Sequence, residues 1–294
     1  MKKITTIGLT FLLLFLHFNV SWANMALIPN KTINPSEKKM VAVAGAITGP
    51  VAVCLNQTNS IVTFTGSGGT APYTFTYKIG TGTNATIVTT TGNTVTLPLV
   101  TSTAGTFVYT LVSIHDSVAP TVEIVQTDTY TVTVKPLPSA NVGANKTICD
   151  NSSTTIGVTT VTGSTYSWTA SPADTSLTTT TVSAPSVSPN ATTIYTLTET
   201  NNGCSDSNPV TVIVNPLPTI SGTTNVCVGS TSNLNGSGVA NATTPWTSSN
   251  TALATVDNTG IVTGILAGTS NISYKNSNGC IRTIVFTVKA LPVA

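Results

Sequence analysis

The sequence predicts an all-β protein made of three β-sandwich domains in tandem, and three observations support this prediction. Threonine occupies about 60 of the 294 positions, and valine stands beside it repeatedly. Both side chains are β-branched and favour strands over helices. Three strands of this composition, at 130–135, 210–215 and 284–289, each run into a linker that ends in Leu-Pro. No stretch of ten residues has the apolar spacing of an amphipathic helix.

Residues 1–23 have the features of a secretory signal peptide. Two lysines precede an apolar run at 7–20, and Ser21 and Ala23 place small residues before a cleavage site after Ala23. The alternative is an uncleaved membrane anchor, but a run of about 14 residues is short for a hydrocarbon core of about 30 Å. We therefore expect a secreted chain with no integral membrane span after cleavage, in which residues 24–46 form a leader or linker.

Low charge excludes several classes of partner. Charged residues make up 7% of the chain, against about 25% in a typical soluble protein. Lys2 and Lys3 leave with the signal peptide, so nine of the 11 basic residues remain to balance nine acidic ones. Because the mature chain is then neutral, we expect no nucleic-acid partner.

The chain also offers little material for catalysis or metal binding. Its two histidines are His17 and His115, too few for a metal cluster or a Ser-His-Asp site. His115, Asp116 and Ser117 are adjacent in the sequence. Neighbouring residues on a strand point to opposite faces, so this spacing does not form a relay. We expect a non-enzymatic protein with no cofactor and no metal.

The recurring strand and linker set the expected domain boundaries. Alternate residues of each terminal strand are apolar and would face inward. The prolines that follow cannot join a sheet ladder and favour a short extended segment. A spacing of about 80 residues between linkers suits small immunoglobulin-like sandwiches rather than solenoid repeats. We expect domains at 47–135, 136–215 and 216–290, with residues 291–294 beginning a further linker.

A tyrosine lies upstream of the first two terminal strands. Tyr109 and Tyr195 both begin the sequence Tyr-Thr-Leu, which we place on the penultimate strand of a sandwich. In immunoglobulin-like domains a buried tyrosine at this place often ties a loop through its hydroxyl. The alternative is a plain strand aromatic. We expect both tyrosines to be structural residues of the cores.

Four of the five cysteines occupy matching places in the second and third domains. Cys149 and Cys204 are 55 residues apart, and Cys227 and Cys280 are 53 residues apart. A signal peptide implies an oxidising compartment, so we expect each pair to form a bridge within its own domain. Trp168 lies between the first pair, where a sandwich would pack it on the bridge. The alternative is a thiolate metal site, but no histidine and no Cys-x-x-Cys motif accompanies these cysteines.

Residues 246–274 resemble the bacterial immunoglobulin-like group 2 (BIG2) domain. The likeness covers most of the third domain and rests on these positions: Trp246, Val256, Asp257, Gly260, Val262, Gly264, Gly268, Ile272 and Tyr274. The first two domains are similar to the PKD-like and immunoglobulin-like repeats of large surface adhesins from gliding Gram-negative bacteria. That similarity rests on 71–77, on 105–113 and on the Pro-Leu-Pro linkers. It implies a domain type and supplies no catalytic residues.

Cys54 has no partner within its own domain. Two interpretations stay open, a buried free thiol or a bridge to another chain. In the repeats that the first domain resembles, a second cysteine usually stands shortly before the last strand. None is present between 116 and 126, so the resemblance favours an unpaired Cys54.

We expect a secreted or cell-surface repeat protein that forms a stalk or adhesive segment of a bacterial adhesin. Its partner would be a surface polysaccharide or another cell-surface protein. Because the sequence stops soon after the third linker, we interpret it as a fragment of a longer repeat protein; the alternative is a protein held on the surface by something else. The competing hypothesis is a carbohydrate-binding accessory segment of a secreted glycoside hydrolase, which an exposed row of aromatic side chains would favour. Trp168 and Trp246 are both expected in the cores.

Overall fold

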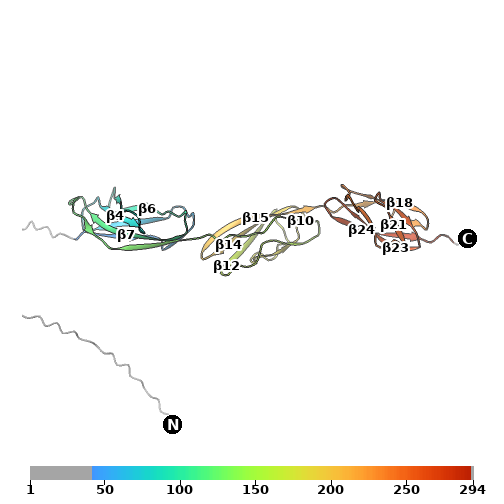
Figure 1. Ribbon diagram of the computed structural model, residues 1–294, viewed down its shortest axis with the longest axis horizontal. Helices are drawn as coiled ribbons and strands as arrows, with labels where there is room; N and C mark the ends of the chain where they lie inside the picture. The colour runs from blue at the N-terminus through green and yellow to red at the C-terminus, as the bar shows by residue number, and fades with distance from the viewer. Residues whose placement is uncertain (1–41, 293–294) are drawn as a thin grey trace, which may run out of the picture. The chain divides into compact units, whose positions relative to one another are not determined.

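The computed structural model describes residues 42–292, which form strands joined by turns and loops (Figure 1). The expected signal peptide, most of the expected leader and residues 293–294 lie outside the described residues. Within the described range the fold is all-β, as the composition predicts. No helix there is long and apolar enough to cross a membrane.

The first nine strands, which we name unit 1, form two sheets. Their bounds are β1 Ala44–Thr48, β2 Ala52–Cys54, β3 Ile61–Ser67, β4 Thr74–Ile79, β5 Ala85–Val88, β6 Thr94–Pro98, β7 Gly105–His115, β8 Ile124–Val125 and β9 Thr129–Lys135. One sheet has the order β1-β3-β6, and the other has the order β2-β9-β7-β4-β5, with β8 paired to β7. β1 begins before the expected domain start at 47, because it pairs along β3 and buries alternate residues.

The next six strands form unit 2. Their bounds are β10 Lys146–Cys149, β11 Thr154–Thr155, β12 Ser164–Ser171, β13 Ser186–Val187, β14 Thr193–Asn201 and β15 Cys204–Asn215. The main sheet has the order β10-β15-β14-β12, and β11 pairs with β13. β14 and β15 form a long antiparallel hairpin with a two-residue turn, Asn202 and Gly203.

The last nine strands form unit 3. Their bounds are β16 Ile220–Ser221, β17 Asn225–Cys227, β18 Thr231–Asn233, β19 Asn235–Gly236, β20 Trp246–Ser248, β21 Ala254–Val256, β22 Ile261–Gly264, β23 Gly268–Lys275 and β24 Ile281–Lys289. The sheets have the orders β17-β24-β23-β20, β18-β22-β21 and β16-β19.

One arrangement recurs in all three units. A short strand runs parallel to the terminal strand, and the terminal strand pairs antiparallel with the long strand before it. The terminal strands are β9, β15 and β24, and each ends immediately before a linker that contains Leu-Pro. The proline-punctuated strands of the sequence are therefore the last strands of the three units, and each lies between two other strands of its sheet.

Each unit has its own cluster of buried hydrophobic residues. Tyr109 lies in the cluster of unit 1, Trp168 and Tyr195 in that of unit 2, and Trp246 in that of unit 3. All four are at most 6% exposed, so these aromatic residues occupy the cores, where the sequence predicts them. Trp246 packs on Tyr274 with ring centroids 4.7 Å apart, a separation typical of aromatic pairs in cores.

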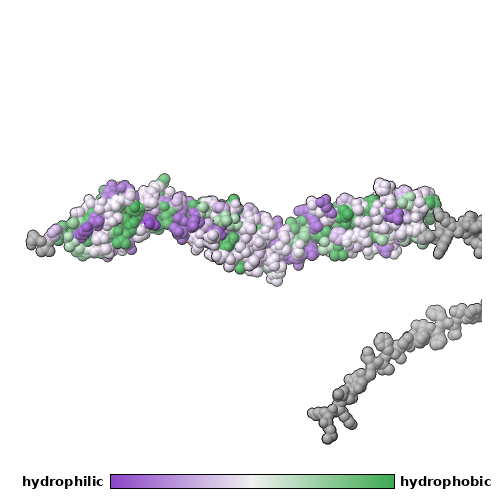
Figure 2. Space-filling model, turned by 180° about the vertical axis from the view of Figure 1, so that it is seen from behind, coloured by the Kyte–Doolittle hydropathy of each residue, from purple (hydrophilic) through white to green (hydrophobic). Residues whose placement is uncertain are grey.

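The surface reflects the threonine-rich strands. On the face drawn in Figure 2, much of the surface has intermediate hydropathy, and the hydrophobic and hydrophilic residues form small separate groups. A threonine side chain presents both a methyl group and a hydroxyl, which gives an outward strand face this mixed character.

Candidate functional site

The five cysteines occupy two recurring positions. Cys54, Cys149 and Cys227 end the short parallel strands β2, β10 and β17, and we name them the strand-end cysteines. Cys204 and Cys280 each follow an Asn-Gly dipeptide at the hairpin turn where the terminal strand begins, and we name them the hairpin cysteines. Both hairpin glycines adopt φ near +80°, a conformation that favours glycine in tight hairpin turns.

The disulfides join successive units. Cys54 is bonded to Cys204 and Cys149 is bonded to Cys280, with Cα–Cα distances of 5.6 Å in both bonds. Cys227 is a free thiol. The predicted bridges Cys149–Cys204 and Cys227–Cys280 are therefore wrong, and so is the prediction that Cys54 is unpaired.

Strand register explains why the predicted bridges do not form. Cys149 lies opposite Asn215, the last residue of β15, whereas Cys204 is the first residue of the same strand. About 11 residues of extended strand therefore separate the two cysteines, or roughly 36 Å at about 3.3 Å per residue. A disulfide requires a Cα–Cα distance of about 4.4–6.8 Å. The two cysteines of unit 3 lie at opposite ends of β24 in the same way.

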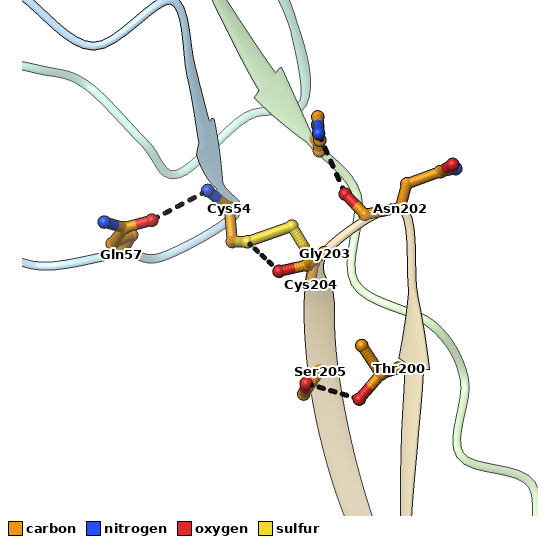
Figure 3. Close-up of a disulfide and its surroundings, with 8 residues drawn as sticks. Cys54, Gln57, Thr200, Asn202, Gly203, Cys204 and Ser205 are labelled. Carbon is orange, nitrogen blue, oxygen red and sulfur yellow. Dashed lines mark hydrogen bonds between the residues drawn. A yellow bond between two sulfur atoms is a disulfide. The ribbon is translucent and has the colours of Figure 1, made fainter. Parts of the chain in front are cut away.

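The first bond connects β2 to the hairpin of β14 and β15 (Figure 3). Beside it, Lys135 Nζ donates a hydrogen bond to the carbonyl oxygen of Asn202 at 2.8 Å. The backbone N–H of Cys54 donates to Gln57 Oε1 at 3.0 Å, and the sulfur of Cys54 lies 3.7 Å from the carbonyl oxygen of Gly203. Lys135 ends the terminal strand of unit 1, so a charge-assisted hydrogen bond accompanies the covalent bond between units 1 and 2.

The second bond connects β10 to the hairpin of β23 and β24. Asn276 holds this hairpin: its Oδ1 accepts a hydrogen bond from the N–H of Cys280 at 2.9 Å, and its own N–H donates to the carbonyl oxygen of Cys280 at 3.0 Å. Both residues are buried. The backbone of Cys280 is thus fixed where its sulfur meets Cys149.

Two side chains of unit 2 hold the linker that follows unit 1. Glu199 is buried; its Oε2 accepts a hydrogen bond from the N–H of Ala140 at 2.9 Å, and its Oε1 accepts one from Ser164 Oγ at 2.6 Å. Asn208 Nδ2 donates to the carbonyl oxygens of Ser139 and Ala140 at 3.0 and 3.3 Å. Because a buried carboxylate is unfavourable unless it is hydrogen-bonded, this pairing fixes the end of the linker to unit 2.

Glu199 is not among the residues predicted from the sequence, although the sequence contains a signal for it. β14 buries alternate residues, and Glu199 follows Tyr195 and Leu197 on the inward face. A charged residue at an inward position of a strand needs hydrogen-bond partners. That position therefore indicates a structural carboxylate.

Tyr195 ties a loop of unit 2 through its hydroxyl, which donates to Asp174 Oδ2 at 2.5 Å. Burial and the interaction with Asp174 raise the pKa of Tyr195. Burial also acts to raise the pKa of Asp174, but hydrogen bonds from Ser176 and Tyr195 outweigh it and lower that pKa. Of the two interpretations of the tyrosine, the loop tie holds in unit 2.

Near the end of β7 a histidine, a carboxylate and a serine meet without forming a catalytic relay. His115 Nδ1 lies 2.9 Å from Glu123 Oε1, and Ser113 Oγ donates a hydrogen bond to the same carboxylate. The serine contacts the carboxylate rather than the imidazole, so the three side chains lack the serine–histidine–carboxylate order of a catalytic triad. Asp116 accepts hydrogen bonds from backbone N–H groups, that of Thr70 foremost, which lower its pKa. Residues 42–292 contain no cluster of three or more His, Cys, Asp or Glu side chains arranged to hold a metal ion.

Known proteins share the immunoglobulin-like fold. Residues 137–216 match the family described as "Ig-like domain CHU_C associated". The search of curated protein sequences found no match.

Among solved structures, the chain is similar to a mutated variant of three titin immunoglobulin domains, with 14% identity, 86% of this chain and 100% of that chain covered, and a TM-score of 0.37. It is also similar to invasin, described as a bacterial integrin-binding protein, with 14% identity and a TM-score of 0.35; the match covers 84% of this chain and 60% of that chain. A third similar structure is the surface-layer protein SbsC, with 18% identity and a TM-score of 0.23; the match covers 79% of this chain and 40% of that chain. The chain thus spans 60% of the invasin chain and 40% of the SbsC chain that it matches.

Proposed function

We propose that this chain is a non-enzymatic stalk or adhesive segment of a secreted bacterial surface protein. The observation that carries the proposal is the pair of disulfides Cys54–Cys204 and Cys149–Cys280, each of which joins successive units. A bond within one domain stabilises that domain alone, whereas a bond between two domains also restrains their movement relative to each other. A segment that has to transmit force or hold a binding surface away from the cell benefits from that restraint.

Other features of the junctions support the same role. Proline fixes φ, and the Pro-Leu-Pro linkers favour extension. Glu199 and Asn208 hold the first of these linkers, and Lys135 adds a hydrogen bond beside the disulfide. Disulfides persist in oxidising compartments, which supports secretion through the expected signal peptide at 1–23 and a location at the cell surface.

Within this proposal the third expected domain is a bacterial immunoglobulin-like group 2 domain, and the first two are PKD-like or immunoglobulin-like repeats. The hairpin turn of the group 2 motif supports the assignment. Asp257 Oδ1 accepts hydrogen bonds from the N–H groups of Thr259 and Ile261, both at 2.9 Å. Gly260 adopts φ of +94°, and a Cβ at this position would lie 2.2 Å from the carbonyl oxygen of Leu234. The turn therefore requires glycine at 260.

The proposed partner is a surface polysaccharide or another cell-surface protein. The competing function, a carbohydrate-binding accessory segment of a glycoside hydrolase, needs exposed aromatic rings on which sugars stack. Every aromatic side chain within 42–292 is buried or half-buried. We therefore favour the stalk.

Small-angle X-ray scattering on residues 42–292 tests the proposal. Three sandwiches with strands of about 8 residues, stacked end to end, would form a rod on the order of 100 Å long with a radius of gyration of about 30 Å. A compact globule of about 250 residues has a radius of gyration of about 18 Å. A measured value near the compact one would refute the stalk, and retention of the protein on insoluble cellulose or chitin would favour the competing function.

A further inference from the structure

The three strand-end cysteines occupy one structural position. Each is the last residue of the short parallel strand, and each lies opposite the last residue of the terminal strand. The opposed pairs are Cys54 with Lys135, Cys149 with Asn215, and Cys227 with Lys289. All three cysteines are half-buried. Cys227 thus stands in unit 3 where its two bonded counterparts stand in units 1 and 2.

The backbone hydrogen bonds around the three cysteines are also the same. The residue after each cysteine donates its N–H to the carbonyl oxygen of the last terminal-strand residue. These bonds run from Leu55 to Lys135 at 2.8 Å, from Asp150 to Asn215 at 2.9 Å, and from Val228 to Lys289 at 3.0 Å. The residue three positions after each cysteine donates to the cysteine carbonyl oxygen. These donors are Gln57, Ser152 and Ser230, at 3.1, 3.0 and 3.0 Å. Cys227 is therefore held by the same local structure that holds the two bonded cysteines.

The partners of the two bonded cysteines define what Cys227 would bind. Cys54 and Cys149 are each bonded to the hairpin cysteine of the unit that follows. Both hairpin cysteines of this chain are thereby used, and unit 1 carries no cysteine besides Cys54. A second copy of this chain would offer no hairpin thiol to Cys227, so the matching partner is a hairpin cysteine from a different unit.

We propose that Cys227 is a covalent docking site for a further immunoglobulin-like unit placed directly after Pro292, whose hairpin carries a cysteine after an Asn-Gly turn. Both existing bonds reach from a strand-end cysteine past a linker containing Leu-Pro to the hairpin of the next unit. Ala290, Leu291 and Pro292 repeat that linker after unit 3. The inference concerns the chemistry of one thiol and does not depend on the proposed stalk function.

The bond forms by thiol–disulfide exchange with an oxidant such as oxidised glutathione. The Cys227 thiolate attacks one sulfur of the oxidant, a glutathione thiolate leaves, and a mixed disulfide remains. The hairpin thiolate then attacks the sulfur of Cys227, and the second glutathione leaves as a thiolate. The two cysteine thiols thus lose two protons, the two glutathione thiolates take up two protons, and one oxidised glutathione is reduced to two molecules of glutathione.

The test extends the chain after Pro292 with a second copy of residues 219–292, so that the copy follows Pro292 as Thr219 follows Pro218. The extended protein is refolded in a glutathione buffer, its free thiols are counted by alkylation under denaturing conditions, and its bonds are mapped on non-reduced peptides. We expect one free thiol, on the copy's counterpart of Cys227, and a bond from Cys227 to the copy's counterpart of Cys280. In the matched control Cys227→Ser, two free thiols are expected, both on the copy.

A second extension, with residues 139–218, keeps the test independent of one copy's folding, because this copy carries the other hairpin cysteine, Cys204. Burial of the copied tryptophan, measured by fluorescence quenching, reports whether each copy is folded. If a folded copy leaves Cys227 and its own hairpin cysteine both open to alkylation while Cys54–Cys204 and Cys149–Cys280 form, the proposal is overturned. This result would leave the scattering test of the stalk unaffected.

Discussion

The two disulfides interleave along the chain, and this order limits how far the protein can be stretched. Cys149 lies inside the loop closed by Cys54 and Cys204, and Cys204 lies inside the loop closed by Cys149 and Cys280. A force applied between residues 42 and 292 follows the shortest covalent path. That path runs to Cys54, crosses to Cys204, returns along the chain to Cys149, crosses to Cys280 and continues to 292.

The three possible bonding states differ strongly in maximum extension. The path through the observed bonds contains about 80 residues, which extend to about 270 Å at about 3.4 Å per residue. With both bonds reduced, about 250 residues extend to about 850 Å. Bridges within units 2 and 3 would leave a path of about 140 residues, or about 480 Å.

Single-molecule stretching with handles at residues 42 and 292 separates these states. We expect the oxidised protein to stop near 270 Å and the protein in dithiothreitol to reach about 850 Å. Cys54→Ser combined with Cys204→Ser leaves only the second bond and should extend to about 400 Å, whereas Cys227→Ser should match the parent. An oxidised parent that reaches about 480 Å or more would refute the bonding pattern on which the proposed function depends.

Three further predictions concern unit 2. Trp168→Ala should lower the free energy of unfolding of unit 2 by about 3–5 kcal/mol, because the indole is a fully buried core side chain. Urea denaturation followed by circular dichroism measures this loss. The unfolding transition of unit 3, followed by Trp246 fluorescence, should stay at the same urea concentration. Glu199→Ala should cost about 1–3 kcal/mol by leaving the buried N–H of Ala140 without its acceptor; faster hydrogen exchange at that amide checks the cause, and Glu199→Gln should have a smaller effect. Tyr195→Phe should cost about 1–2 kcal/mol at neutral pH. Because the pKa of Asp174 is lowered in the folded protein, its contribution to stability is present above about pH 4 and is lost as pH falls through the folded pKa. Urea titrations across this range should show a smaller decrease in the free energy of unfolding at acid pH for the phenylalanine variant than for the parent. An equal decrease in both proteins would contradict the role of the tyrosine.

The strands and cores were predictable because local rules determine them. β-branched residues favour strands, proline ends them, and alternate apolar residues of a strand share one face. The terminal strand of unit 2 follows these rules, with Val210 and Val212 buried and Pro216 beginning the linker after it. None of these inferences needs to know which strand lies beside which. Trp168 was placed in the core by a different argument, as packing on a bridge between Cys149 and Cys204; the side chain is buried, but that bridge does not form.

The cysteine pairing was not predictable, because it depends on register and on the neighbouring unit. Three strand-end cysteines and two hairpin cysteines allow two consistent patterns. Pairing within units leaves Cys54 unpaired, and pairing between successive units leaves Cys227 unpaired. The matching positions of the cysteines in the sequence fit both patterns equally well. The choice is made by the parallel register of β10 and β15, which places Cys149 at the far end of the sheet from Cys204. The spacing of the cysteines in the sequence does not determine that register.

The observed bonds also stabilise single units almost as well as the predicted ones would. If unit 2 unfolds while unit 1 stays folded, the bond from Cys54 to Cys204 still closes a loop, because Cys54 is fixed beside Lys135 by the pairing of β2 with β9. That loop contains about 70 residues, and in the chain-entropy model closing it destabilises the unfolded unit by about 4 kcal/mol. A bridge over the 55 residues from Cys149 to Cys204 would contribute about the same. Placing the bonds between units therefore keeps the stabilisation that each small sandwich needs. It also limits the maximum extension of the chain more than bonds within units would.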